Sequence, residues 1–202
     1  LAAMSAFIPR TGPCTGPETG PCKGSLSEAD RALRVWDPVV RVFHWSLVGF
    51  FVTNAFLDNP EKALHHYIGY AVVALVGLRV LWGLIGTRHA RFSDFPPSIP
   101  AAIGQAQDMV TGRRHIHAGH SPLGALMIYN LLATFLAIGV TGYMQLTVRF
   151  FGMDWVRELH GVFVTWAEIS VAAHVAAVIF ESRRLKINLA RAMVTGTKTI
   201  PR

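Results

Sequence analysis

The residues of this sequence that could hold a metal or a cofactor are histidines within or at the ends of apolar stretches. They are His44, His65, His66, His160 and His174. An ionisable side chain in a membrane-length apolar segment carries an insertion cost, so each is a functional candidate. His160 and His174 are 14 residues apart, which on a helix places them on nearly one face and about 21 Å apart along the axis. One helix would then offer an imidazole near each of its ends.

Helices that cross a membrane would position these histidines. Of the 202 residues, 51% are hydrophobic and only 15% are charged, which is too apolar for an ordinary soluble domain. About 20 helical residues span the roughly 30 Å hydrocarbon core of a bilayer. We expect transmembrane helices at residues 39–57, 65–86, 122–146 and 159–180. The predicted fold class is therefore an all-α membrane protein with a bundle of four transmembrane helices.

The basic residues are distributed by loop. A formal net charge of +7 would suggest a nucleic-acid partner in a soluble protein, but in a membrane protein cytoplasmic loops carry the excess of Lys and Arg. The basic residues before the first helix, between the second and third, and after the fourth include Arg31, Arg34, Arg41, Arg88, Arg91, Arg113, Arg114, Arg183, Arg184, Lys186, Arg191 and Lys198. The other two loops are short and mixed in sign. We expect both termini in the cytoplasm and no nucleic-acid partner.

The alternating direction of the four helices predicts which histidines face each other. His44 lies at the cytoplasmic start of the first helix, level with His174 near the end of the fourth. His65 lies at the outer start of the second helix, level with His160. Two neutral imidazoles that face each other across a bundle can ligate a haem iron from both sides. The sequence therefore predicts two haems b between the helices, one in each leaflet, with a histidine pair for each iron.

Other interpretations of these residues remain open. A tetrahedral zinc site needs clustered ligands, and a di-iron bundle needs several inward carboxylates where only Glu168 is available, so both fit less well. The histidines could also form hydrogen bonds between helices, but their pairing by leaflet favours haem. For Glu168, we expect a protonated carboxyl that hydrogen-bonds a neighbouring helix, and the alternative is a proton relay in quinol chemistry.

Three arginines are candidates to bind the haem propionates, which are anions that need cationic or hydrogen-bonding partners. They are Arg41, Arg79 and Arg157. The first and the last each precede a candidate histidine by three residues, one helical turn outward. Arg79 follows His65 by 14 residues and so reaches the inner leaflet on nearly the same face of its helix. The alternative for Arg79 is a side chain that extends along the lipid to the cytoplasmic surface.

Five motifs together resemble one protein family. They are RVWDPVVRVFHW from Arg34, HHYIGYAVVALVGLRVLWGLIG from His65, RHARFSDF from Arg88, GHSPLGA from Gly119 and ELHGVFVTWAEISVAAHVAAVIFES from Glu158. From about residue 34 to 198 the chain resembles the bacterial cytochrome b561 family, which includes the b-type cytochrome subunits of membrane-bound hydrogenases. The resemblance implies two haems b with bis-histidine ligation in the bacterial inner membrane. It also implies electron transfer between the quinone pool and a redox partner such as a cytochrome c, a dehydrogenase or a hydrogenase.

The resemblance also assigns residues. It places the iron ligands at His44, His65, His160 and His174. The family's HxxxG pattern falls on His65 and Gly69, which leaves His66 as the other candidate. Gly161 follows His160 where many relatives have Glu. Two other functions fit the same resemblance: a self-contained quinone oxidoreductase, for example between superoxide and quinone, or a haem-bearing membrane anchor for a periplasmic dehydrogenase or hydrogenase.

Three segments divide the chain. Residues 1–33 are rich in Gly, Pro, Thr and Ser and are predicted to be a disordered cytoplasmic lead, in which we expect Cys14 and Cys22 to be reduced bystanders. Residues 34–187 form the predicted cytochrome b domain, and residues 188–202 a basic cytoplasmic tail. Between residues 98 and 110, apolar side chains at helical spacing predict a helix on the cytoplasmic surface.

Overall fold

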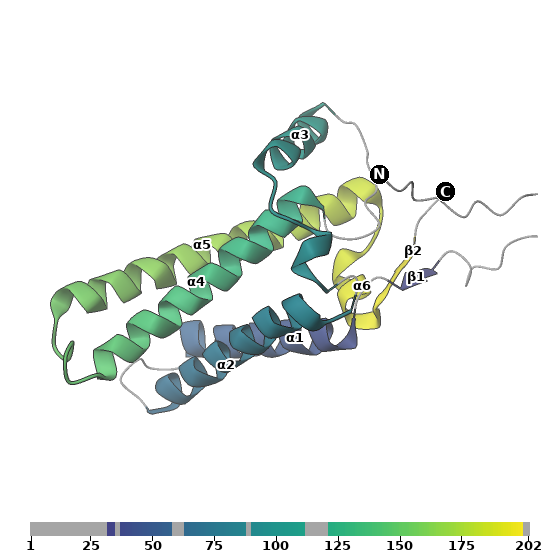
Figure 1. Cartoon of the computed structure of the whole chain (residues 1–202). Coiled ribbons are helices and arrows are strands. Elements are labelled where there is room, and N and C mark those ends of the chain that lie inside the picture. Colours follow the sequence, from purple (N-terminus) through teal and green to yellow (C-terminus); the bar gives the residue numbers. More distant parts are fainter. Residues whose placement is uncertain (1–31, 35–36, 58–62, 88–89, 112–120, 200–202) are drawn as a thin grey trace, which may run out of the picture.

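A computed structural model describes residues 32–34, 37–57, 63–87, 90–111 and 121–199 of the chain. In this part of the chain, four helical segments are long and apolar enough to cross a membrane. They are α1 (Pro38–Val52) with the π-helical turn η2 (Thr53–Leu57) that continues it, α2 (Ala63–Ile85), α4 (Pro122–Leu146) and α5 (Asp154–Leu185). These segments confirm the predicted all-α bundle of four transmembrane helices (Figure 1).

Short polar residues followed by proline fix the start of α1 and of α4. Asp37 Oδ1 accepts a hydrogen bond of 2.7 Å from the Val39 N–H, and Ser121 Oγ accepts one of 3.2 Å from the Gly124 N–H. Proline follows each cap in the first turn of the helix. A side-chain cap satisfies one of the N–H groups that a helix start leaves unpaired, and proline has no N–H to lose there. Both starts are therefore encoded locally.

Helix α5 is longer at both ends than the predicted span of residues 159–180. Its first turn contains Asp154 and Arg157, which form an exposed ion pair of 2.5 Å, and its last turn contains Arg183 and Arg184. An acidic first turn and a basic last turn both interact favourably with the helix dipole. The helix ends at Lys186, which has a left-handed backbone with φ of 56°. The apolar run in the sequence thus marks only the middle of a helix whose ends are polar.

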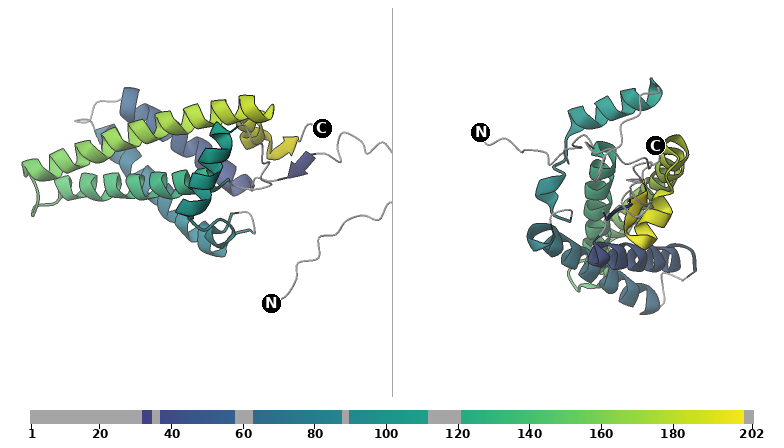
Figure 2. Two further views of the ribbon diagram at one scale, coloured as in Figure 1. Left: turned by 90° about the horizontal axis from the view of Figure 1, so that it is seen from above. Right: turned by 90° about the vertical axis from the view of Figure 1, so that its right-hand side faces the viewer.

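The four long helices form two neighbouring pairs that pack across one apolar core. Helices α4 and α5 lie side by side along their length, and α1 and α2 lie against them (Figures 1 and 2). The buried core consists of Ile68, Val72, Val76, Leu132, Phe135 and Ala167. Helix α2 comes so close to α4 that a Cβ atom on Gly139 would overlap the Val73 side chain. The absence of a side chain at Gly139 therefore permits this close crossing.

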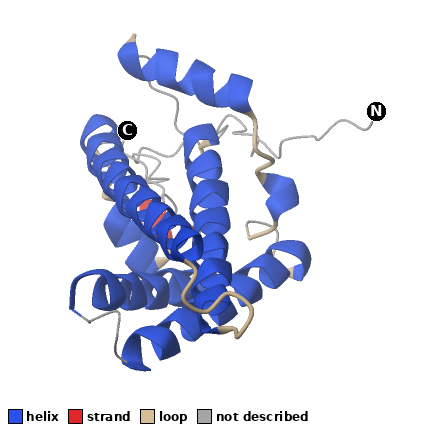
Figure 3. Cartoon of the chain, turned by 90° about the vertical axis from the view of Figure 1, so that its left-hand side faces the viewer, coloured by secondary structure: helices blue, strands red, loops and turns tan. Residues whose placement is uncertain are grey.

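The smaller elements lie at the end of the bundle where α1 and α4 begin and α2 and α5 end. They are η3 (Phe92–Asp94), α3 (Ile99–Val110), α6 (Leu189–Thr195) and two short antiparallel strands, β1 (Ala32–Arg34) and β2 (Thr197–Thr199) (Figures 1 and 3). The helix predicted at residues 98–110 is confirmed as α3, with Ile99 and Ile103 exposed. The strand pair and α6 were not predicted, because they depend on contacts between distant segments.

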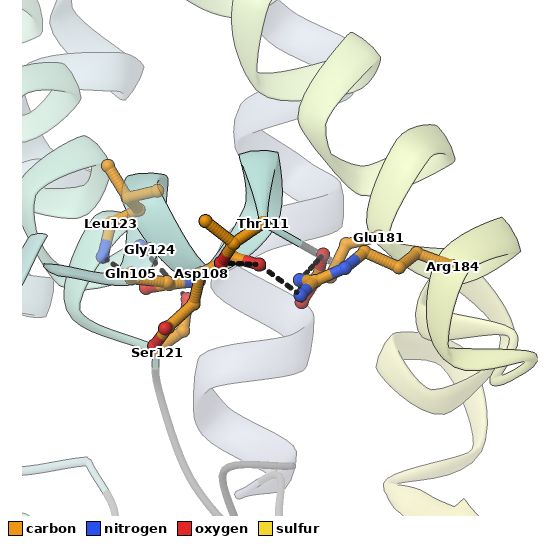
Figure 4. A network of polar contacts seen from close by, with 8 residues as sticks. All are labelled: Gln105, Asp108, Thr111, Ser121, Leu123, Gly124, Glu181 and Arg184. Carbon is orange, nitrogen blue, oxygen red and sulfur yellow. Dashed lines mark hydrogen bonds and ion pairs between the residues drawn. The ribbon is translucent and has the colours of Figure 1, made fainter. Parts of the chain in front are cut away.

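Polar contacts attach α3 to this end of the bundle (Figure 4). Arg184 forms an ion pair of 3.3 Å with Glu181 on α5, and its guanidinium also donates to the Asp108 carbonyl on α3 at 3.2 Å. Gln105 on α3 accepts a hydrogen bond of 2.9 Å from the Leu123 N–H at the start of α4. Helix α3 is therefore held to both α4 and α5.

Candidate functional site

His44 on α1 and His174 on α5 face each other, as the sequence predicts. Their ring centroids are 6.4 Å apart and their ring planes are inclined by 58°. An imidazole nitrogen binds a metal at about 2 Å, so two imidazoles that ligate one ion from opposite sides have ring centres roughly 6 Å apart. The observed separation therefore fits a single iron between the two rings.

The His44 ring has one nitrogen with unusual surroundings. Its Nδ1 atom is buried and has no hydrogen-bond partner among the residues that the structure describes. Buried polar atoms in proteins are nearly always paired, so such an atom calls for an explanation. The edge of the Trp45 ring lies against the His44 ring, with the centroids 5.4 Å apart. The described residues around His44 therefore supply an aromatic contact from Trp45 but no hydrogen bond to this nitrogen.

His65 on α2 and His160 on α5 form the second predicted pair, at the opposite end of the bundle. The two side chains are close enough to interact electrostatically. The neighbouring His66 packs edge-on against His65, with ring centroids 6.0 Å apart. The choice between His65 and His66 as the partner of His160 stays a prediction.

Residues of α4 hold the His160 ring. Thr141 Oγ1 lies 3.0 Å from His160 Nδ1, and a Cβ atom on Gly142 would lie 3.2 Å from His160 Cε1. Thr141 was not predicted from the sequence. The sequence does place this threonine in the uncharged third span, directly before Gly142, and a glycine there lets another helix approach closely.

Four of the five histidines in the described part of the chain belong to the two predicted pairs, and His66 lies beside one of them. No group of three or more His, Cys, Asp or Glu side chains that could hold a metal ion occurs among the described residues. A zinc or di-iron site would need such a group. A haem needs only two protein ligands, since the porphyrin supplies the remaining four. The donor set therefore fits haem.

The three predicted propionate-binding arginines have different surroundings. Arg41 donates to the Val194 carbonyl of α6, and its Nε atom is buried without a hydrogen-bond partner among the described residues. Arg157 is 74% exposed and pairs with Asp154. Arg79 is only 4% exposed: it donates to the Ala90 carbonyl at 3.2 Å and lies 5.0 Å from the centre of the Phe92 ring. Arg79 therefore binds the loop after α2, and its side chain does not extend to the surface.

Glu168 lies near the middle of α5, and its side chain is exposed. This exposure does not fit the expected hydrogen bond of the carboxyl to a neighbouring helix of the same bundle. Burial had been expected because a carboxyl at mid-membrane depth is costly. The sequence pattern could not show which side of the helix the residue occupies relative to α4.

A polar contact between α4 and α5 occurs instead at Asn130. Its side-chain amide donates to Ser170 Oγ at 2.9 Å, and its Oδ1 atom accepts from Trp166 Nε1 at 3.0 Å. Hydrogen bonds between transmembrane helices contribute about 0.6 kcal/mol each on average. This contact helps to align α5, which carries both His160 and His174.

Replacement of Asn130 by leucine should lower the free energy of unfolding by about 1 kcal/mol, because two interhelical hydrogen bonds are lost. Denaturant titration of the protein in mixed micelles measures this change. Ser170→Ala is the matched variant, since it removes only one of the two bonds and should cost about half as much. An Asn130→Leu protein as stable as wild type would contradict the stabilising role of this contact.

Comparison with known proteins identifies the family. The family model described as prokaryotic cytochrome b561 matches residues 35–196, which is most of the chain. No curated protein and no solved structure matches the chain. The family match agrees with the four membrane-spanning helices. The chain therefore belongs to the prokaryotic cytochrome b561 family, and it is a membrane-spanning b-type cytochrome that takes part in electron transfer.

Proposed function

We propose that this cytochrome binds two haems b, one between His44 and His174 and one between His65 and His160, and transfers electrons between the quinone pool and a redox partner. The observation that carries the proposal is the 6.4 Å separation of the His44 and His174 rings, which suits two axial ligands of one iron. Haem b supplies a one-electron carrier, and with two histidine ligands its iron has no open position for substrate.

The residues of the chain would perform three tasks for this function. Helix α5 contributes His160 and His174, whose spacing of 14 residues sets the two sites about 21 Å apart along the helix axis. Helices α1 and α2 contribute one opposing imidazole each. The apolar core between α2 and α4, which includes Val76 and Phe135, would keep water out of the space between the two sites.

Arg41 is the arginine that we propose as a propionate partner of the haem near His44. It lies three residues before His44, and its buried Nε atom has no partner among the described residues, so it retains a donor for an anion. Arg157 would serve the other site if it exchanged its exposed contact with Asp154 for a propionate. Arg79 already contacts the Ala90 carbonyl and the Phe92 ring, so it is a weaker candidate to bind a propionate.

We also propose that the end of the bundle that bears α3 and α6 faces the cytoplasm of a bacterial cell. The basic residues Arg91, Arg183, Arg184 and Arg191 lie at this end, and an excess of Lys and Arg is typical of cytoplasmic loops. A reporter fused after residue 202, active only on one side of the membrane, tests this orientation. Periplasmic activity of the reporter would contradict it.

Reduction of the purified protein by a short-chain quinol, decylubiquinol, tests the proposed reaction. We expect both haems to become reduced, as seen in the absorbance spectrum, and to be reoxidised by a soluble acceptor such as cytochrome c. Dithionite, which reduces haem without a quinone site, serves as the control. Haems that dithionite reduces fully but decylubiquinol leaves oxidised would contradict an exchange of electrons with this quinone.

A further inference from the structure

Thr141 on α4 contacts both its own helix and a proposed haem ligand. Its side chain is 4% exposed. Its Oγ1 atom lies 2.8 Å from the Ala137 carbonyl, 3.1 Å from the Ile138 carbonyl and 3.0 Å from His160 Nδ1. A single hydroxyl group therefore connects the backbone of α4 to the imidazole ring on α5.

The single hydrogen of the Thr141 hydroxyl limits the directions of these hydrogen bonds. A threonine hydroxyl has one hydrogen to donate and two lone pairs to accept with. A hydrogen that the hydroxyl donates to the carbonyls of the preceding helical turn leaves an oxygen lone pair for the contact with His160. His160 Nδ1 then carries the hydrogen.

We propose that Thr141 is a positioning residue that fixes the tautomer and the orientation of His160, so that Nε2 is the nitrogen with a free lone pair for iron. This inference rests on the proposed ligation of a haem by His160. Partners that accept the N–H of a ligating histidine fix its tautomer and make it a stronger electron donor to the metal. Gly142 contributes by leaving room for the ring beside α4.

The two proposed sites would therefore differ. His160 Nδ1 has the Thr141 hydroxyl within hydrogen-bond distance, whereas His44 Nδ1 has no hydrogen-bond partner among the described residues. A more basic ligand stabilises the oxidised iron, so the Thr141 contact should lower the reduction potential of the haem bound by His160. The effect should be confined to this haem, because the proposed sites lie at opposite ends of α5.

The variant Thr141→Val tests the inference, because it removes the hydroxyl and keeps the branched shape of the side chain. Redox titration of the haem-loaded protein should show a higher reduction potential for one haem. Its equilibrium constant for reduction should change on the order of tenfold, which equals 59 mV for one electron. The haem affected should be the one that His160→Ala removes. The low-temperature electron paramagnetic resonance signal of the same haem should shift, and Thr141→Ser, which restores the hydroxyl, should recover both values.

Thr134→Val is the matched control. Thr134 is also a buried threonine on α4 and makes the same type of bond to its own helix, donating to the Asn130 carbonyl at 2.7 Å. It should shift neither potential. A Thr141→Val protein that retains both haems with unchanged potentials and spectra would overturn the inference while leaving haem binding intact, as would an equal shift in Thr134→Val. If Thr141→Val loses the haem, failure of Thr141→Ser to retain it would also overturn the inference. A wild-type protein without this haem would overturn the proposed function itself.

Discussion

Replacement of His44 by alanine should remove one of two haems, and replacement of His174 by alanine should remove the same one. The two rings are 6.4 Å apart, so each would supply one axial ligand to a common iron. Loss of one histidine leaves an open coordination position and removes one of the two protein ligands of the iron. Haem content per chain, with the reduced-minus-oxidised spectrum and a redox titration, measures the loss. The double variant should retain as much haem as either single variant.

His66→Ala is the control for this set of variants. His66 packs against His65 in the same helix, so its replacement tests whether loss of any nearby imidazole is enough to release haem. We expect it to retain both haems, whereas His65→Ala and His160→Ala should each lose the haem that His44→Ala retains. Two different haems lost from His44→Ala and His174→Ala, or a normal haem content in both, would contradict the pairing.

Replacement of Gly139 by leucine should destabilise the bundle by about 1–3 kcal/mol, the usual cost of extra volume in a packed core. Even a Cβ atom at this position would overlap the Val73 side chain, so α2 and α4 would have to separate. Denaturant titration in mixed micelles measures the change. Because α2 carries His65, the separation should also weaken retention of the haem at the His65 and His160 pair.

Gly77→Leu is the matched variant for Gly139. Gly77 lies within α2, and a Cβ atom added there would have no neighbouring atom within 4 Å, so a larger side chain meets open space. Leucine is also a better helix former than glycine, and the variant should be as stable as wild type or slightly more stable. Equal effects of the two substitutions would show that the crossing of α2 and α4 is not as tight as described.

Most of the fold could be predicted from the sequence, because apolar runs of membrane length specify the spans directly. The spacing of His160 and His174 on one helix also indicated that the site would be divided between the two ends of the bundle. The partner His174 of His44 then followed from the alternating direction of the helices, and the structure brings these two rings together. The family inferred from the motifs is confirmed by the match over residues 35–196.

The features that could not be predicted depend on contacts between elements. Thr141 lies in a run that reads as an ordinary apolar helix, and its importance appears only when α5 packs beside α4. The exposure of Glu168 depends on the rotation of α5 relative to its neighbour, which periodicity does not define. Arg79 binds the Ala90 carbonyl of a loop whose path the sequence did not reveal. The expectations for residues 1–31, including Cys14 and Cys22, lie outside the described residues.

The haem content of the wild-type protein, purified in mild detergent and expressed per chain, tests the central claim most directly. Extraction of the haem identifies its type, and the reduced-minus-oxidised spectrum reports the coordination of the iron. We expect two haems b per chain, both low-spin and each with two histidine ligands. A chain that binds a single haem, or none, would contradict it.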